Sequence, residues 1–249
     1  PVPSFESYRL AAESVDADIT YYHMKDLCIH EDIIDILAGN IDVLVLANPN
    51  NPTGFIMEEG LLYKIIAYCK IKNIFILLDE CFLDFIKTGE QYSLCGKLDT
   101  FDNMAILKSL TKLYAFPGLR FGYLLTYNCD IMYGLKKLTP SWEINALALE
   151  AAGYSLKQNM DSVIEEIQKE KSILSDNLEN SGIVTFPSKV NFLLCKYKKN
   201  LSKELLEHGI IVRDCSDFIG LNENYFRVAV RTNPENNLLV DTIQKIIRG

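Results

Sequence analysis

Residues 41–54 read IDVLVLANPNNPTG, an apolar run followed by a polar, Pro-containing run. Its first half is a short run of Ile, Val and Leu, which is typical of a buried strand, so we predict a strand over residues 41–46. Its second half is rich in Asn, Pro and Gly, the residues that form turns. Open α/β sheets hold their ligands where buried strands end. The stretch therefore predicts an α/β sheet with a candidate site at this strand end.

The segments on either side alternate between apolar runs and amphipathic stretches. Before residue 41, a Pro-rich start leads into a helical pattern without a preceding strand. After residue 54, we predict a helix over 58–70 and strands over 74–78, 104–107 and 121–125, with a turn at Pro117-Gly118. This alternation predicts a large domain over residues 1–150 with a mostly parallel sheet and helical crossovers.

The pattern changes in the second part of the chain. Apolar positions from Met160 to Leu178 follow helical spacing, and Gly182 is expected to end that helix. Beyond it we predict strands over 190–195, 210–213 and 225–230, a helix over 201–208, and a last helix opened by Asn233-Pro234. Residues 151–249 are therefore predicted to form a smaller α+β domain.

Charge and composition exclude several classes of function. The chain has 249 residues, 49% of them hydrophobic, and 25 Lys and Arg against 33 Asp and Glu give a net charge of −8. Without a basic tract, we expect no nucleic-acid partner and no membrane partner, and an anionic ligand must be held by local arginines. Apolar runs fall short of the roughly 20 residues that cross a bilayer, and the start lacks the features of a signal peptide. We predict a cytoplasmic protein.

The cysteines and histidines do not suggest a metal site. Seven cysteines are scattered without a C-x-x-C pair, and three histidines lie far apart in the sequence. Zinc sites and disulfide frameworks show paired spacings instead. We predict reduced cysteines and no metal.

Four short motifs follow the predicted strands in a fixed order: NPNNPTG at 48–54, DECF at 79–82, SLTK at 109–112 and GLRFG at 118–122. Together they resemble the enzymes of the aspartate aminotransferase fold, which use pyridoxal 5′-phosphate (PLP), and the resemblance covers nearly the whole chain. The sequences of the motifs are most similar to those of the threonine-phosphate decarboxylase and histidinol-phosphate aminotransferase branches. The glycine-bearing turn that usually precedes these motifs is not visible, so the resemblance implies a chain that lacks the N-terminal part of the fold.

The resemblance implies roles for the residues of these motifs. Lys112 would bind PLP covalently, and Ser109 and Arg120 would hold its phosphate, which a guanidinium group matches bidentately. Asp79 follows four apolar residues, so its carboxylate should be partly buried and should pair with the protonated ring nitrogen.

Three further residues would contact the ring. Asn51 matches the family residue that donates to the ring hydroxyl, whereas Asn48 and Asn50 are expected to be turn residues. Phe5 would stack on the ring, the alternative for Phe5 being ordinary core packing. Phe82 stands where the aminotransferases of this group usually have a tyrosine.

Arginines in the second domain would bind the substrate, because an arginine in an apolar strand needs an anionic partner. By resemblance Arg227 takes the α-carboxylate and Arg213 a substrate phosphate. Arg231 is expected on the strand face of Arg227 by period-two alternation. A buried salt bridge with Asp214 or Asp217 is the alternative for Arg213. Asn191 is a weaker candidate.

The resemblance implies a homodimer, with the active site between the domains, and a phosphorylated amino acid or amine as substrate. Phe82, the segment 142–148 and the second arginine, Arg231, favour decarboxylation of L-threonine-O-3-phosphate, with transamination of histidinol phosphate as the alternative. An inactive cofactor-binding fragment is a remote alternative. So is a serine β-lactamase-like hydrolase, because Ser109-x-x-Lys112, SDN at 175–177 and KTG at 87–89 reproduce its signatures, although in the wrong order.

Overall fold

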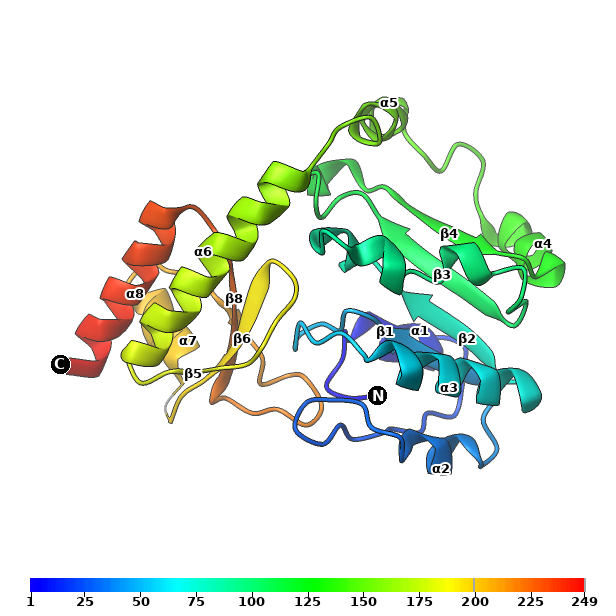
Figure 1. Cartoon of the computed structure of the whole chain (residues 1–249), viewed down its shortest axis with the longest axis horizontal. Coiled ribbons are helices and arrows are strands. Elements are labelled where there is room, and N and C mark those ends of the chain that lie inside the picture. The colour runs from blue at the N-terminus through cyan, green and yellow to red at the C-terminus, as the bar shows by residue number, and fades with distance from the viewer. Residues whose placement is uncertain (199, 249) are drawn as a thin grey trace. The chain divides into compact units, whose positions relative to one another are not determined.

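The computed structural model of the chain describes residues 1–198 and 200–248 (Figure 1). The chain divides into two compact units, and each is described by itself. Unit 1 comprises residues 1–28, 50–56 and 161–249, and unit 2 comprises residues 29–49 and 57–160. Residues 1–28 and 50–56 therefore group with the C-terminal part of the chain. The division into domains at residue 150 stays a prediction.

Unit 2 is built on a four-stranded sheet in the order β1-β2-β3-β4. The strands are β1 (Val43–Ala47), β2 (Phe75–Asp79), β3 (Met104–Ser109) and β4 (Gly122–Thr126). β1, β2 and β3 are parallel, and β4 is antiparallel to β3. The predicted mostly parallel sheet is confirmed, and each strand lies within two residues of its predicted bounds. Because β1, β2 and β3 are parallel, their carboxyl ends meet at one edge of the sheet.

Unit 2 also contains four α-helices and four 3-10 turns within its described residues. They are α2 (Ile33–Leu37), α3 (Glu59–Ile71), α4 (Cys129–Leu138) and α5 (Ala146–Ser155), with 3-10 turns at Leu83–Phe85, Gly89–Tyr92, Cys95–Lys97 and Pro117–Leu119. Helix α3 is the crossover from β1 to β2, and it buries Leu62, Ile65, Ile66 and Cys69. Its first turn is capped by Glu58, whose side chain accepts a hydrogen bond from the Gly60 N–H.

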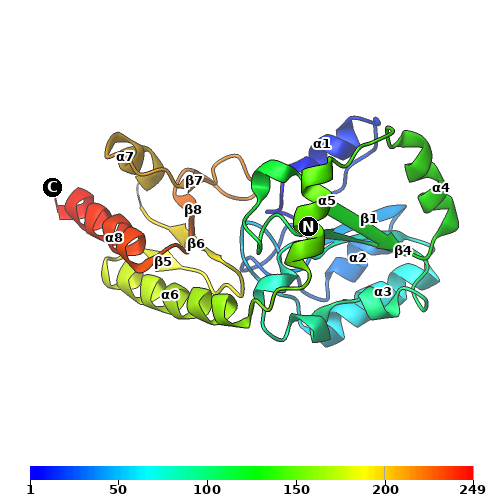
Figure 2. The same ribbon diagram turned by 90° about the horizontal axis from the view of Figure 1, so that it is seen from above.

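Unit 1 holds an antiparallel sheet in the order β5-β6-β8-β7. The strands are β5 (Val184–Thr185), β6 (Phe192–Lys196), β7 (Arg213–Asp214) and β8 (Tyr225–Ala229), and the helices are α1 (Ser7–Glu13), α6 (Asp161–Asn180), α7 (Leu201–Glu207) and α8 (Asn233–Arg248). Helices α6 and α8 run side by side along the sheet (Figures 1 and 2). The core between them includes Leu174, Leu193, Phe226 and Ile243. The predicted α+β arrangement of this part is confirmed.

Two predictions for this sheet are wrong. Residues 210–212 are not in a strand, because Gly209 is left-handed (φ +76°) and the Ile210 N–H bonds back to the Leu205 carbonyl of α7. Strand β8 ends at Ala229, so Arg231 does not share a strand face with Arg227. The Arg231 N–H instead donates to Asn236 Oδ1 at the start of α8.

No helix in the described part of the chain is both long enough and apolar enough to span a bilayer. Within the same residues, no group of three or more His, Cys, Asp or Glu side chains is placed to bind a metal ion.

Candidate active site

The first group of predicted site residues lies in unit 2, where β2 and β3 end. Asp79 is the last residue of β2 and Ser109 the last of β3. Asp79 pairs in register with Leu107, two residues before Ser109, so the side chains of Asp79 and Ser109 point to the same face of the sheet. Asp79 is half-buried, as expected, and its Oδ1 accepts a hydrogen bond of 2.8 Å from the Cys81 N–H. This bond holds the carboxylate at the strand end.

The side chain of Lys112 lies beside an aromatic ring. Its Nζ is 5.9 Å from the centroid of the Phe82 ring, and that ring stacks on Phe85 at 6.1 Å. Lys112 is exposed and forms no ion pair with the carboxylates of residues 1–198 and 200–248. The amine is therefore accessible to a ligand.

The charges of Asp79, Lys112 and Lys108 also act on the thiol of Cys81. Burial raises the pKa of the Cys81 thiol, the Asp79 carboxylate raises it further, and the charges of Lys112 and Lys108 oppose the rise. The thiol therefore stays protonated at neutral pH. We assign Cys81 no nucleophilic role.

Ser109 and Arg120 offer donors for an anion. Ser109 Oγ lies 2.8 Å from Thr111 Oγ1, so two hydroxyl groups meet at the end of β3. Arg120 follows the turn before β4 and is left-handed (φ +54°), a conformation that is uncommon for non-glycine residues. Its Nη1 donates to the Pro117 carbonyl at 3.2 Å, and most of the side chain is exposed. The guanidinium group thus keeps free donors.

A buried ion pair lies next to this group, and sequence reasoning missed it. Lys108 Nζ is 3.1 Å from Glu80 Oε2, and both side chains are buried. The signal was present in the sequence, since each of the two charged residues adjoins an apolar strand and a predicted site residue. Charged residues in such places are rarely buried without a partner.

The second group of predicted site residues lies in unit 1 around Arg227 of β8. The Arg227 guanidinium lies 4.8 Å from the centroid of the Phe192 ring, and its Nη1 donates to Asn51 Oδ1. Burial lowers the pKa of Arg227, the Cys215 thiol raises it and Arg213 lowers it. No carboxylate of residues 1–198 and 200–248 forms an ion pair with it. A half-buried cation of this kind favours an anionic ligand.

Arg213 faces Arg227 across the sheet. The two residues are partners in the register of β7 and β8, so their side chains start from the same face. Arg213 Nη2 is 2.6 Å from Asp217 Oδ2, and its guanidinium lies 5.2 Å from the Phe218 ring centroid. An ion pair with Asp217 was the alternative expected for Arg213, as a buried salt bridge. The observed ion pair is not buried, because both side chains are more than 40% exposed.

Asn191 carries an unsatisfied polar atom. Its Oδ1 is buried without a hydrogen-bond partner in the described structure, while its carbonyl accepts from the Val230 N–H at 2.8 Å. A buried polar atom without a partner is costly and indicates a missing ligand or water. This supports Asn191 as a candidate.

Phe5 is held near the turn that carries Asn51. Asn50 is buried and its Nδ2 donates to the Pro3 carbonyl at 3.0 Å, which ties residues 3–5 to that turn. Phe5 is 44% exposed and contacts Tyr8 edge-on at 5.7 Å. Phe5 is therefore not among the buried residues of the core, and its stacking on the ring stays a prediction.

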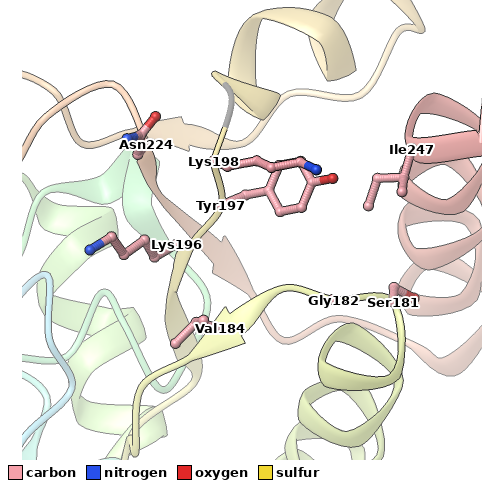
Figure 3. A pocket seen from close by; sticks show the side chains of 8 residues that line it. All are labelled: Ser181, Gly182, Val184, Lys196, Tyr197, Lys198, Asn224 and Ile247. Atoms are coloured by element: carbon pink, nitrogen blue, oxygen red, sulfur yellow. The ribbon is translucent and has the colours of Figure 1, made fainter.

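Two features of unit 1 lie apart from these groups. Arg231 is exposed and pairs with Glu235 at 2.6 Å, which accounts for its charge. A shallow surface cavity of about 480 Å³ also lies in this unit and contains none of the predicted site residues (Figure 3). Its lining consists of Ser181, Gly182, Val184, Lys196, Tyr197, Lys198, Asn224 and Ile247.

Comparisons with known proteins agree with the motifs. The profile of the family described as "Aminotransferase class I and II" matches residues 1–243. The chain is 30% identical over 256 residues to the threonine-phosphate decarboxylase of Salmonella typhimurium, covering 99% of this chain and 70% of that protein. It is 29% identical over 262 residues to the histidinol-phosphate aminotransferase of Methanococcus aeolicus, covering 99% and 68%.

A solved structure is similar over nearly the whole chain. The histidinol-phosphate aminotransferase from Clostridium acetobutylicum superposes with a TM-score of 0.93 at 29% identity, covering 99% of this chain and 76% of that one. This match confirms the predicted fold class.

Proposed function

The chain belongs to the class I and II aminotransferase family, whose members are PLP enzymes, and from this premise we propose that its substrate is a phosphorylated amino acid or amine. The observation that carries the proposal is the pair of arginines in register on β7 and β8. One of them lacks a carboxylate partner in the described structure, and the other has only an exposed one. A substrate that carries both a carboxylate and a phosphate suits two such cations.

The residues of unit 2 fit the cofactor by their chemistry. Bound PLP supplies a sink for the electrons released at the substrate α-carbon. Lys112 offers an accessible amine for its covalent attachment, and Asp79 offers a fixed carboxylate for the ring nitrogen. Ser109 and Arg120 offer hydroxyl and guanidinium donors for its phosphate.

Residues of unit 1 complete the assignment. Asn51 would donate its side-chain amide N–H to the ring hydroxyl, since its Oδ1 already accepts from Arg227. Phe5 would stack on the ring, since it is an exposed aromatic side chain tied to the Asn51 turn. Arg227 binds the substrate α-carboxylate and Arg213 the substrate phosphate. Arg231 is a weaker member of the substrate group, because it is already paired with Glu235. Asn191 is also a weaker member, supported by its buried Oδ1.

Within this class we favour decarboxylation of L-threonine-O-3-phosphate. Phe82, the ring beside Lys112, lacks the hydroxyl group that a tyrosine there would direct to the cofactor oxygen. By holding the α-carboxylate, Arg227 would orient the substrate α-carbon, and that orientation would decide between loss of carbon dioxide and loss of a proton. Transamination of histidinol phosphate is the second candidate, favoured by the similarity to the Clostridium acetobutylicum structure.

Parallel assays separate the two candidates. The PLP-loaded protein is incubated with L-threonine-O-3-phosphate and, separately, with histidinol phosphate and 2-oxoglutarate, while carbon dioxide and glutamate are measured. We expect carbon dioxide from the first mixture and none when Lys112 is replaced by alanine. Glutamate from the second mixture, with no carbon dioxide from the first, would identify an aminotransferase.

A further inference from the structure

A buried ion pair lies directly behind the cofactor residues of unit 2. It joins Glu80, whose side chain is 1% exposed, and Lys108, whose side chain is 9% exposed. Lys108 Nζ lies 3.1 Å from Glu80 Oε2 and 3.4 Å from Oδ1 of the half-buried Asp84. Two charges this deeply buried are costly unless their geometry is good and their other polar atoms are hydrogen-bonded.

The two ends of the ion pair adjoin two of the proposed cofactor residues. Glu80 follows Asp79, and Lys108 precedes Ser109. Because side chains alternate along a strand, Lys108 points to the face of the sheet opposite Ser109. The pair therefore lies behind the face of Asp79 and Ser109, where it can orient both residues without touching the cofactor.

Backbone and side-chain bonds lock this arrangement. The Glu80 N–H donates to the Leu107 carbonyl at 3.0 Å, which extends the β2–β3 pairing past Asp79. Glu80 Oε2 accepts from Ser93 Oγ at 2.7 Å, and Oε1 accepts from the Leu94 N–H at 2.9 Å. Burial lowers the pKa of Lys108, but Glu80 and Asp84 raise it more, so the amine remains charged. The Glu80 carboxylate thus has a donor for each oxygen.

We propose that the Glu80–Lys108 ion pair is a positioning device that fixes the ends of β2 and β3, and with them Asp79 and Ser109, in the geometry that binds the cofactor. The inference rests on the proposed function, because it needs PLP at this strand end. It assigns Glu80 and Lys108 a role that the motifs alone do not give them. Neither residue is catalytic, since both act through their neighbours.

Titration of the apoprotein with PLP tests the proposal. Lys108→Met removes the charge while keeping an unbranched chain, Lys108→Arg keeps the charge, and Glu80→Gln keeps the shape of the carboxylate without its charge. Lys70→Met is the matched control, because it breaks the exposed Lys70–Asp102 pair in the same unit. The dissociation constant of PLP, the pH midpoint of the bound cofactor's visible absorbance and the melting temperature of the apoprotein are measured.

We expect Lys108→Met and Glu80→Gln to raise the dissociation constant of PLP at least about tenfold. This is the effect of losing roughly one charge-assisted hydrogen bond. Both variants should also shift the absorbance midpoint, while Lys108→Arg and Lys70→Met stay near the unchanged protein. A lower melting temperature with an unchanged dissociation constant and midpoint would overturn the proposal, because the pair would then be only structural. Should Lys108→Met fail to fold, the isosteric Glu80→Gln decides.

The outcomes also separate this inference from the proposed function. If the unchanged chain binds no PLP, the proposed function fails and the inference fails with it. If the unchanged chain binds PLP and both charge-removing variants bind it equally well, the inference alone fails.

Discussion

Arg213 and Arg227 are neighbours in register, yet their surroundings differ. Arg227 is half-buried on Phe192 and bonded to Asn51, whereas Arg213 is exposed and paired with Asp217. An exposed ion pair contributes only about 0–1 kcal/mol to stability, so a phosphate can replace Asp217 as the partner of Arg213 at little cost. The difference suits Arg227 to a fixed role in carboxylate binding and Arg213 to the recognition of one class of substrate.

Arg213→Ala should therefore impair the use of phosphorylated substrates selectively. We expect KM to rise about 10- to 100-fold for the phosphorylated substrate, because a charge-assisted hydrogen bond contributes about 1.5–3 kcal/mol. The unphosphorylated analogue should be affected much less. Steady-state kinetics with both compounds check this, with Arg9→Ala as a control that breaks an exposed arginine pair in the same unit. Equal losses for the two compounds would contradict the assignment of Arg213.

The site could be predicted from the sequence only in part, and the reason lies in how each residue is fixed. Asp79 and Ser109 could be placed because a short apolar run defines where a strand ends. Arg231 was misplaced, because β8 ends at Ala229 and the Arg231 side chain pairs with Glu235 of the following helix. The Glu80–Lys108 pair was missed, because a contact between strands depends on their register, which the motifs do not give.

The turn that carries Asn51 is tightly packed. Gly54 is left-handed (φ +68°), its N–H donates to the Asn50 carbonyl at 2.8 Å, and its carbonyl accepts from the Lys189 N–H at 3.0 Å. A Cβ atom at Gly54 would lie 2.2 Å from Ser188 Oγ. The turn is thus clamped against the loop that precedes β6, which fixes Asn51 within unit 1.

Gly54→Ala should destabilise the protein by about 1–3 kcal/mol, because the alanine meets both the unfavourable φ and the contact with Ser188. Gly134→Ala provides the opposite case, since Gly134 lies within α4 with nothing near its added Cβ. That change should stabilise by about 0.5–1 kcal/mol. Urea unfolding measures both variants, and a Gly54→Ala protein as stable as the unchanged one would refute the tight packing of this turn.

The elements themselves differ in how well the sequence predicts them. The strands of unit 2 were predictable because each is an apolar run bounded by turn residues. Helices α4 and α5 were not predicted. Helix α5 has apolar residues all round, so it lacks the usual stripe that marks one buried face. Helix α4 is amphipathic although it buries no residue, so its pattern was an available signal. The side-chain caps at Asn128 and Asn145 were a further signal for the two helix starts.

The whole chain has a net charge of −8, yet it buries a lysine in unit 1. Lys171 on α6 is 8% exposed, and its Nζ donates to the Val190 carbonyl at 3.0 Å and to Gln168 Oε1 at 2.5 Å. Burial, with a smaller effect of Lys189, lowers the pKa of Lys171 to about 8. The folded chain therefore loses this proton at lower pH than the unfolded chain does.

Stability should consequently gain a contribution from Lys171 as the pH rises. Between about pH 8 and 10.5 the unfolded state binds more protons at this site than the folded state, so the free energy of unfolding increases with pH. Relative to Lys171→Met, the unchanged protein should gain about 2 kcal/mol from pH 7.5 to 10. Chemical unfolding of both proteins across this range measures the difference. Thiols such as Cys69, whose pKa is raised by burial to about 11, have the opposite effect on stability. Their effect is the same in both proteins and cancels in the difference. A constant difference would show that Lys171 titrates normally.

If this chain binds PLP through Lys112, the cofactor can be trapped on that residue. The protein is incubated with PLP, reduced with borohydride, digested and analysed by mass spectrometry, with Lys112→Ala and Lys97→Ala treated in parallel. We expect a yellow protein whose colour is lost on reduction, and a cofactor adduct on the peptide that contains Lys112. The adduct should be kept in Lys97→Ala and absent in Lys112→Ala. An adduct on another lysine, or none in the unchanged protein, would show that Lys112 does not attach the cofactor.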